Sequence, residues 1–430
     1  MHESTERTRQ GCNLQGALQT LNEIKGIIPI LHSNPGCGVQ NYFANKATFS
    51  SYGYLGGYEI PNSNVFEKQV IFGGTSRLRE QIKNTVKVLK GDLYVVLSGC
   101  EAEMVGDDII AMTQEIIDQG EKAIFYKAPG FAGNQYTGYT GVLNAIITQL
   151  PKVFNPPTDK KKGLINILGI LPKQDIHWKG NLAELKRIFG AIGIEANTLF
   201  GYGQGLEQWK QLPEAELNLV VSKWGISAAE KLKEQYGTPY LVFDSIGLGT
   251  EIEAMIRAVA EALVVDPVSV ERYLQEEKKS FAHVLEQFSE YAYDHDFQKT
   301  VAIIGEESTV VRYGSFLTKY WGMEIEIAII TDFLGSTEEQ EIPEALREVA
   351  KEIYYSKDTS TISKIIRSGK IELILGSGLE NEVARHLGIP NYIISYPAIG
   401  KVIINKSDIG YSGADSILED LSNVLLGTPV

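Results

Sequence analysis

The sequence is poor in cysteine and in basic residues, and each shortage excludes a class of protein. Three cysteines in 430 residues are too few, and odd in number, for a disulfide framework. The 40 lysines and arginines are outnumbered by 54 acidic residues, which gives a net charge of −14. Because nucleic acids and anionic membrane surfaces attract positive charge, we expect neither as a partner.

Long apolar runs are missing as well. No stretch approaches the roughly 20 consecutive apolar residues of a membrane-spanning helix, and the opening MHESTERTRQ has no apolar segment of the secretory kind. Cysteines without a secretory signal fit a reducing compartment, so we expect a cytoplasmic location. The pattern GxxxxGK[ST] does not occur, so the chain lacks the phosphate-binding loop of that class of ATPase.

Short apolar runs that end in glycine, serine or asparagine are abundant, and they alternate with segments of helical periodicity. Such runs are typical of parallel strands buried on both faces. We predict strands at Ile27–His32, Leu93–Ser98, Lys122–Tyr126, Ile165–Ile170, Leu217–Ser222, Tyr240–Asp244, Val301–Gly305, Ile325–Thr331, Ile371–Gly376 and Tyr392–Tyr396. The alternation predicts an α/β fold of doubly wound, Rossmann-like domains with mostly parallel sheets.

Two parts of the sequence repeat one pattern. The segments that begin at Leu217 and Ile371 each run from an apolar stretch through a helical stretch to Gly-Thr-Pro or Gly-Ile-Pro and a second apolar stretch. A polar stretch at 155–163 separates the first region from the second, and a charged helical stretch at 268–298 separates the second from the third. We therefore predict three α/β domains, at 1–158, 159–295 and 296–430.

All three cysteines lie in the first of these domains, and each follows a glycine. Cys37 and Cys100 come just after the predicted strands Ile27–His32 and Leu93–Ser98, and Cys12 precedes both. Open α/β sheets bind ligands at the carboxyl ends of their strands, and a glycine lets the backbone approach a bulky ligand. The pattern therefore favours a shared soft-metal site in the first domain.

Two other interpretations of the cysteines remain open, namely three buried structural thiols and a nucleophilic thiol. Zinc is disfavoured because no CxxC pair occurs and the fourth ligand would have to be one of six scattered histidines. His32, the nearest of them in sequence, is expected to be structural. Three thiolates leave a four-iron cluster one ligand short, which indicates that a second polypeptide supplies the rest.

Several segments around these cysteines resemble the subunits of nitrogenase component 1. Cys37 follows Cys12 by 25 positions and ends a His-x-x-x-Gly-Cys loop, and Cys100 begins Cys-x-x-Glu-x-x-Gly-Asp-Asp. The resemblance is most specific around Cys100 and covers essentially the whole chain. Its segments are Cys12, His32–Cys37, Phe66–Gly74, Ser98–Asp108, Pro129–Gly138, Gly376–Glu380 and Ile409–Ala414.

The resemblance implies the same three-domain fold and a role in electron transfer. In this family three such cysteines from each of two related subunits hold an eight-iron cluster. Cys12, Cys37 and Cys100 are therefore expected to bind an iron–sulfur cluster of the [8Fe-7S] P-cluster type, or alternatively a [4Fe-4S] cluster, shared with a partner subunit. The implied partners are a homologous alpha-type catalytic subunit, in a heterotetramer, and a dimeric iron–sulfur protein that hydrolyses ATP.

The chain departs from the catalytic subunits of this family. Those subunits anchor an active-site cofactor through a further cysteine in the second domain and a histidine in the third. Here there is no fourth cysteine, and the last histidine, His386, lies in a predicted helix. The chain therefore resembles the beta-type subunit, and none of its residues is expected to be catalytic. Gly130 replaces a serine that can join the family's cluster on oxidation, which argues against such a ligand here.

Three functions remain in competition. The favoured one is the beta-type subunit of a nitrogenase-like reductase, and the short chain fits a methylthio-alkane reductase better than nitrogen fixation. The alternatives are a subunit of a cofactor-assembly scaffold and a tetrapyrrole reductase subunit with a [4Fe-4S] cluster. Three cysteines on a subunit without cofactor ligands favour the first.

Two further groups of side chains lie near the cysteines in sequence. Glu101, Glu103, Asp107 and Asp108 form an acidic cluster, which we interpret as capping the start of a helix rather than as delivering protons. The tyrosines of Tyr52–Tyr54 are expected either to cover a cluster or to belong to the core.

Overall fold

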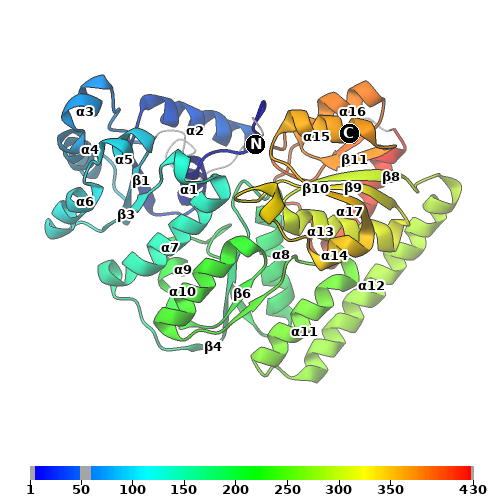
Figure 1. The fold of residues 1–430 in the computed structure, drawn as a ribbon. Coiled ribbons are helices and arrows are strands. Elements are labelled where there is room, and N and C mark those ends of the chain that lie inside the picture. The colour runs from blue at the N-terminus through cyan, green and yellow to red at the C-terminus, as the bar shows by residue number, and fades with distance from the viewer. Residues whose placement is uncertain (1–4, 49–59, 428–430) are drawn as a thin grey trace. The chain divides into compact units, whose positions relative to one another are not determined.

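The computed structural model describes residues 5–48 and 60–427 (Figure 1). The tyrosines of Tyr52–Tyr54, for which the sequence suggested a role, lie outside the described residues. The fold is mixed α/β with parallel sheets, as predicted. Among the described residues, no helix is both long enough and apolar enough to cross a membrane.

The chain divides into two compact units. Unit 1 comprises Met1–Arg9, Gln174–Ala196 and Leu241–Val430. Unit 2 comprises Gln10–Lys173 and Asn197–Tyr240, and it contains all three cysteines. The division into three domains stays a prediction.

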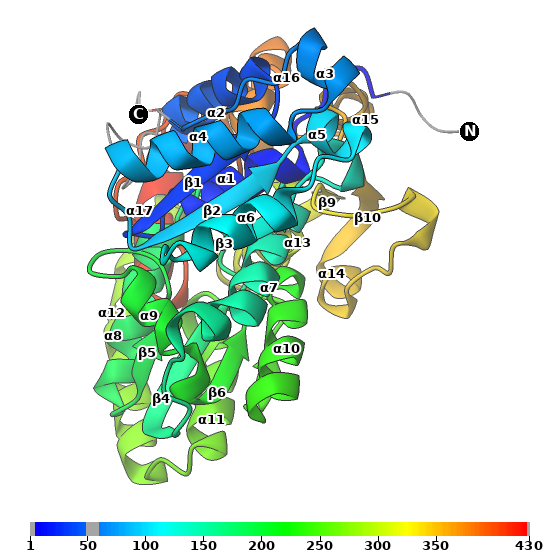
Figure 2. The same ribbon diagram turned by 90° about the vertical axis from the view of Figure 1, so that its left-hand side faces the viewer.

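A three-stranded parallel sheet in unit 2 follows the order β1-β2-β3. Its strands are β1 (Ile27–His32), β2 (Leu93–Ser98) and β3 (Ala123–Lys127). Helices α4 (Thr75–Val88) and α6 (Ile109–Asp118) bury their apolar side chains against Ile30, Tyr94 and Val96 of this sheet (Figure 2). Because β1 and β2 are paired, parallel neighbours, the segments that carry Cys37 and Cys100 leave the sheet at one edge, as the sequence predicted.

The other helices of unit 2 surround this sheet and the next one. They are α1 (Asn13–Leu21), α2 (Pro35–Thr48), α3 (Glu67–Phe72), α5 (Cys100–Val105), α7 (Gln135–Phe154), α9 (Leu206–Lys210) and α10 (Ile226–Tyr236). Helices α1 and α7 pack closely against each other, and α10 packs against α7. Asn134 caps α7 by accepting hydrogen bonds from the N–H groups of Tyr136 and Thr137.

The two other sheets contain the same arrangement of four strands, and one of them has a fifth strand at its edge. The shared arrangement explains the repeated pattern in the sequence. The four-stranded sheet has the order β5 (Glu195–Asn197), β4 (Lys161–Leu168), β6 (Ala215–Val220), β7 (Tyr240–Val242). The five-stranded sheet of unit 1 has the order β10 (Ala350–Tyr355), β9 (Glu324–Ile330), β8 (Thr300–Gly305), β11 (Leu373–Gly376), β12 (Asn391–Ile393). The repeated segments form β6-α10-β7 in one sheet and β11-α16-β12 in the other.

The Gly-x-Pro motif ends the helix of each repeat. Gly237 follows α10 and Gly388 follows α16 (Asn381–Leu387), and each has a φ of 68°. This left-handed conformation suits glycine because it has no Cβ, and a proline two residues later cannot continue a helix. The shared motif therefore marks the same turn between helix and strand in both sheets.

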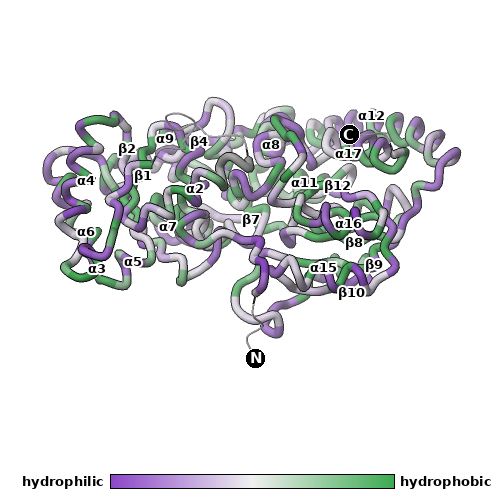
Figure 3. The backbone as a smooth tube through the Cα atoms, turned by 90° about the horizontal axis from the view of Figure 1, so that it is seen from above, coloured by the Kyte–Doolittle hydropathy of each residue, from purple (hydrophilic) through white to green (hydrophobic). Residues whose placement is uncertain are grey.

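The remaining helices belong to unit 1. They are α8 (Trp178–Ala191), α11 (Glu253–Ala262), α12 (Pro267–Asp294), α13 (Glu307–Phe316), α14 (Glu344–Val349), α15 (Thr359–Ser368) and α17 (Gly410–Leu425). Hydrophilic and hydrophobic residues alternate along α12 (Figure 3), as expected for a helix with one buried face. Asp266 caps α12 through the N–H groups of Val268 and Ser269.

The N-terminal residues of unit 1 are held by a buried ion pair. Arg9 donates to both carboxylate oxygens of Glu380, at 2.9 and 3.3 Å, and to Ser377 Oγ at 3.0 Å. The two charged side chains are only 2% and 1% exposed. Ser377 and Glu380 also form a capping box at the end of β11, so the Gly376–Glu380 motif has a structural role in the described fold.

Replacing Arg9 by alanine is expected to destabilise unit 1 by about 3–5 kcal/mol, because it leaves the buried Glu380 carboxylate without its partner. The matched control is Arg7→Ala, which breaks the exposed pair with Glu382, where the side chains are 65% and 61% exposed. Exposed pairs of this kind contribute less than about 1 kcal/mol. Urea unfolding of both variants measures the difference, and equal midpoints would contradict a stabilising role for the buried pair.

Candidate metal centre

Cys12 lies at the N-cap position of α1 and is fixed by the segment that precedes α7. It forms an isolated antiparallel bridge with Asn134. The next residue, Asn13, donates its N–H to the Gly133 carbonyl at 3.1 Å, and Gln135 donates to the Gly11 carbonyl at 2.9 Å. These backbone hydrogen bonds place Cys12 beside the short 3₁₀ turn Gly130–Ala132.

Cys100 is the first residue of α5, and only Gly99 separates it from the end of β2. Gly99 donates its N–H to the His32 carbonyl of β1 at 2.9 Å. A Cβ atom at Gly99 would stand 2.0 Å from Ser33 Oγ, so only glycine allows the two strand ends to lie this close. The glycine before this cysteine therefore serves the approach of two loops.

Cys37 lies in the first turn of α2 and Cys100 is the first residue of α5, so the predicted His-x-x-x-Gly-Cys loop is in part the start of a helix. Ser33 donates from Oγ to Cys37 Sγ at 3.2 Å and lies 3.1 Å from Glu101 Oε2. Ser33, which precedes α2, therefore links Cys37 to Glu101, the residue that follows Cys100. Helix N-termini also favour negative charge, which suits a thiolate.

Gly130 lies beside two of the three cysteines, Cys12 and Cys100. Its N–H donates to Cys100 Sγ at 3.0 Å. A Cβ atom at Gly130 would lie 3.2 Å from Cys100 Sγ and 3.4 Å from Cys12 Sγ, so both sulfurs border the same small space. All three thiols are partly buried, which leaves each of them reachable from outside.

Burial raises the pKa of the Cys37 thiol, and the charges of Glu101, Cys12 and Cys100 raise it further, although the Ser33 hydrogen bond opposes the shift. The interaction with both other thiols is a second sign that the three cysteines lie near one another. Without a cation, Cys37 therefore prefers its neutral form. A bound metal would reverse this preference, because its positive charge stabilises thiolates.

The described residues form no site for a single metal ion. Within residues 5–48 and 60–427, no three cysteine, histidine, aspartate or glutamate side chains are grouped closely enough to hold one metal ion. A zinc site requires such grouping about one centre. An iron–sulfur cluster is larger and binds thiolates at separate iron atoms, so Cys12, Cys37 and Cys100 need only border a common space.

The family model described as nitrogenase component 1 type oxidoreductase matches residues 12–426. The chain belongs to this family. The match begins at the first cysteine and extends into α17, so it covers both compact units.

Curated relatives of the chain include nitrogenase beta chains. The nitrogenase molybdenum-iron protein beta chain of Methanococcus maripaludis is 24% identical, with 96% of this chain and 93% of the relative covered. The vanadium-iron protein beta chain of Trichormus variabilis is also 24% identical, over 96% and 92%. The cofactor biosynthesis protein NifE of Clostridium pasteurianum is 23% identical, over 89% and 81%.

A solved structure described as nitrogenase Cp1 at pH 6.5 has the same fold. The TM-score is 0.82 at 19% identity, with 99% of this chain and 94% of that chain covered. The family match and the nitrogenase beta chains among the relatives support the beta-type resemblance that the sequence indicated.

The acidic cluster after Cys100 has structural roles in this family member. Asp108 accepts a hydrogen bond from Ala111 N at 2.9 Å and caps α6, as predicted. Asp107 accepts from Gly74 N at 2.7 Å and contacts His32 Nε2 at 2.9 Å. His32 is fully buried, and burial lowers its pKa despite the neighbouring Asp107, which agrees with the structural role expected for this histidine.

Exposed apolar side chains lie on α2 and α5, which carry Cys37 and Cys100, and on the turn Gly130–Ala132 and α3, which contact α1 and α5. Phe131 is 67% exposed and follows Gly130, and Met104 is 77% exposed on α5. Others lie on α2 and α3, and they are Val39, Phe43, Val70, Ile71 and Phe72. Apolar side chains in this number on one part of a surface are typical of a protein interface. The periodicity of the sequence does not identify these exposed side chains, because it does not show which side of α3 packs against the rest of the protein.

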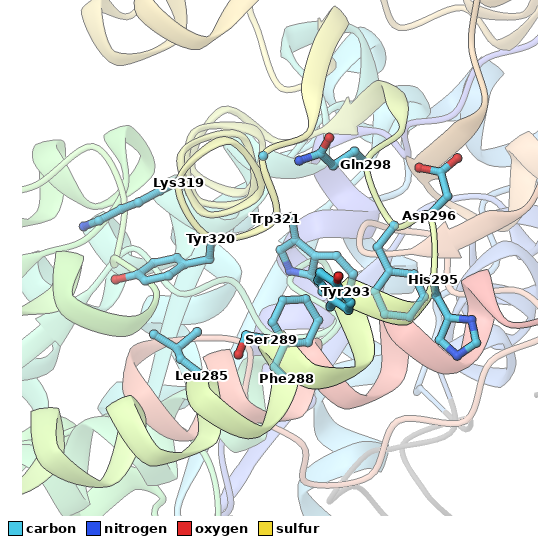
Figure 4. Close-up of a pocket in the computed structure, with 13 residues that line it drawn as sticks. Leu285, Phe288, Ser289, Tyr293, His295, Asp296, Gln298, Lys319, Tyr320 and Trp321 are labelled. Atoms are coloured by element: carbon cyan, nitrogen blue, oxygen red, sulfur yellow. The ribbon is translucent and has the colours of Figure 1, made fainter.

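A separate hollow of about 730 Å³ in unit 1 contains no cysteine. It lies between the end of α12 and the π-helical turn Leu317–Trp321 (Figure 4). Trp321, Phe288 and Phe297 pack against one another there, with ring centroids 4.6–6.2 Å apart. The Tyr320 hydroxyl already pairs with Thr250. We interpret the aromatic packing around this hollow as fixing the C-terminal end of α12.

Two glycines let α1 and α7 approach closely, and this contact positions Cys12. A Cβ atom at Gly16 would stand 1.8 Å from the Gln135 carbonyl oxygen, and one at Gly138 would stand 2.2 Å from the Asn13 carbonyl oxygen. The Thr-Gly of the family-like segment Pro129–Gly138 is therefore a packing feature. The sequence marks this segment as family-like but does not identify the helix that packs against it.

Gly138→Ala is expected to destabilise unit 2 by about 3 kcal/mol, because the helices must separate to admit a methyl group. It should also displace Cys12 and lower the iron content. Gly190→Ala in α8 is the matched control, since a Cβ atom there meets nothing within 4 Å and alanine favours a helix by about 1 kcal/mol. Thermal unfolding of both variants tests this, and an unchanged Gly138→Ala variant would contradict it.

Proposed function

We propose that this chain is the beta-type subunit of a nitrogenase-like, ATP-dependent reductase. Cys12, Cys37 and Cys100 would hold part of an [8Fe-7S] P-cluster-like electron relay, shared with a homologous alpha-type subunit. A [4Fe-4S] cluster is the alternative for the same thiols. The observation that supports this most is that Cys12 and Cys100 border one space beside Gly130, with Cys37 linked to them through Ser33 and Glu101.

When bound, the cluster would supply one-electron transfer. The residues of this chain would bind it and adjust its potential. The Gly130 N–H and the Ser33 hydroxyl donate to two of the three sulfurs, and such hydrogen bonds stabilise the more negative, reduced state of a cluster. Partial burial of the thiols limits access of water.

An alpha-type partner subunit would supply the remaining ligands and cover the exposed apolar side chains. Alpha and beta chains both occur among the relatives, and two such pairs would form a heterotetramer. The active-site cofactor would lie in the partner, because this chain has no fourth cysteine and its last histidine, His386, lies in α16. A dimeric iron–sulfur protein that hydrolyses ATP would deliver the electrons, and the assembly would be cytoplasmic.

A subunit of a cofactor-assembly scaffold is the second candidate, and the similarity to NifE favours it. The two functions differ in what the purified complex does. The complex with an alpha-type subunit should show interfacial cluster signals in electron paramagnetic resonance and should reduce substrate only with the ATP-hydrolysing protein and ATP. Transfer of a cofactor to a separate apo-reductase, without turnover of its own, would instead support the scaffold.

A further inference from the structure

Asn13, the residue that follows Cys12, has a buried side chain with specific contacts. It is only 3% exposed, although most asparagines lie at the protein surface. Its N–H donates to the Gly133 carbonyl oxygen at 3.1 Å, and its Nδ2 atom donates to the Pro129 carbonyl oxygen at 3.5 Å. Asn13 therefore contacts the residues on both sides of the turn Gly130–Ala132.

The same turn contacts the sulfur of Cys100. Gly130 donates its N–H to Cys100 Sγ at 3.0 Å. A Cβ atom at Gly130 would lie 3.2 Å from Cys100 Sγ and 3.4 Å from Cys12 Sγ. The sum of these two distances, 6.6 Å, is the largest possible separation of the two sulfurs. The contacts of Asn13 with the turn therefore help to fix how far Cys12 lies from Cys100.

The side-chain oxygen of Asn13 is bound by Tyr126 of β3. The Tyr126 hydroxyl donates to Asn13 Oδ1 at 2.9 Å. In the parallel register of β2 and β3, Tyr126 pairs with Leu97, which lies three positions before Cys100. This hydrogen bond therefore joins the segment that follows Cys12 to the sheet from which the Cys100 segment leaves.

Gly141 of α7 leaves room for the Tyr126 side chain. A Cβ atom at Gly141 would stand 2.0 Å from the Tyr126 hydroxyl oxygen and 2.2 Å from the ring carbon that carries it. These distances are far shorter than van der Waals contact, so only glycine allows the hydroxyl to lie against this helix. Because the tyrosine packs against the backbone of α7, its hydroxyl has few other positions available.

We propose that Tyr126 and Asn13 are positioning residues, which hold Cys12 and Cys100 at the separation that a metal centre requires before that centre is bound. The inference rests on the proposed function, in which both thiols bind one iron–sulfur cluster. Tyr126 acts through Asn13, and Asn13 acts through the backbone of Cys12 and of the turn Gly130–Ala132. Ligands that are already in place lose less entropy when the metal binds.

Cadmium titration of the cluster-free full chain tests the positioning without iron. Cd²⁺ binds thiolates, and the ultraviolet charge-transfer absorption of the Cd–S bonds reports how many sulfurs coordinate the ion. Tyr126→Phe removes only the hydroxyl, and we expect it to weaken Cd²⁺ binding about tenfold, because the lost hydrogen bond no longer restrains the segment of Cys12.

Tyr94→Phe is the matched control. Tyr94 lies on β2 of the same sheet, and its hydroxyl donates to the Leu89 carbonyl oxygen at 2.7 Å, near the start of the strand. This variant also loses one buried hydrogen bond, so its thermal stability should fall about as much as that of Tyr126→Phe. Its Cd²⁺ affinity should equal that of the unaltered chain. An unchanged Cd²⁺ affinity in Tyr126→Phe would overturn the proposal.

A double variant separates positioning from a general loss of stability. If Tyr126 acts through Asn13, Tyr126→Phe should not weaken Cd²⁺ binding further in a chain that already carries Asn13→Ala, whereas independent effects would add. Additive effects would therefore overturn the proposal. In the purified complex with the partner subunit, redox titration followed by electron paramagnetic resonance should show a shifted midpoint potential for Tyr126→Phe and an unshifted one for Tyr94→Phe.

Cys12→Ser distinguishes a failure of this proposal from a failure of the proposed function. It should weaken Cd²⁺ binding at least as much as Tyr126→Phe does. If Cys12→Ser weakens binding and Tyr126→Phe does not, the two thiols share a site but the positioning role is wrong. If Cys12→Ser binds Cd²⁺ as tightly as the unaltered chain, Cys12 is not a ligand of a shared site and the proposed function fails.

Discussion

Cys100→Ala is expected to abolish the interfacial cluster and the turnover that depends on it. The variant loses one thiolate at the start of α5 and also the sulfur that accepts from Gly130 N. The expected result is at least a hundredfold loss of ATP-dependent reduction, because no relay would connect the electron donor to the catalytic subunit. Electron paramagnetic resonance and iron analysis of the purified complex measure the loss of cluster.

Two comparisons distinguish the loss of one cluster ligand from unfolding of the protein. Cys100→Ser keeps an oxygen at the same place, so it should retain more iron than the alanine variant while its cluster signals change. The cofactor of the partner subunit, which would be bound away from the interface, should still be loaded in both variants. Full activity and unchanged cluster signals in Cys100→Ala would show that Cys100 is only structural.

Phe131→Asp is expected to prevent stable association with the partner subunit. Phe131 is 67% exposed and adjoins Gly130, beside the sulfurs of Cys12 and Cys100. Burying a carboxylate without a partner in an apolar interface costs several kcal/mol. We expect the dissociation constant to rise at least about a hundredfold, which corresponds to about 2.7 kcal/mol. Analytical ultracentrifugation over a range of concentrations measures this change.

Tyr202→Asp is the matched control for the interface. Tyr202 is 96% exposed in the same unit but belongs to none of the elements that carry cysteines. The Tyr202→Asp variant should associate with the partner subunit as tightly as the unaltered protein and should have the same iron content. Because Phe131 is exposed within this chain, its replacement should not alter the folding of the chain. If Phe131→Asp assembles as tightly as the unaltered protein, a partner does not cover the cysteine face.

The strands could be predicted from the sequence because their physical signal is local. A strand buried on both faces must be apolar at consecutive positions, and β1 and β2 have the predicted bounds. The short edge strands β5 and β10 were missed. β10 (Ala350–Tyr355) contains the consecutive charged residues Lys351 and Glu352 and is nowhere fully buried, so it lacks the continuous apolar run.

Only part of the candidate site could be predicted, because a local pattern does not show which distant segments of the chain come together. Cys37 and Cys100 were expected together because neighbouring parallel strands end at the same edge of a sheet. Cys12 follows no strand, and the chain reaches the same place through hydrogen bonds with residues 133–135. Sequence spacing alone gives no distance for contacts of this kind, so Cys12 was linked to the others only by its preceding glycine, its place in the first predicted domain and the family resemblance.

The sequence by itself determined the α/β class, the repeated strand-helix-strand segment and the three cysteines as candidate ligands, since each depends on residue type and local periodicity. Only the tertiary structure decided the role of Gly130, the close approach of α1 and α7 through Gly16 and Gly138, and the partner of Arg9. Most of these contacts join residues more than 100 positions apart, such as Arg9 with Glu380 and Gly16 with Gln135. A glycine can lie in a turn, or it can allow another segment of backbone to approach closely. Which of these applies depends on what packs against the glycine, and a local sequence pattern does not show it.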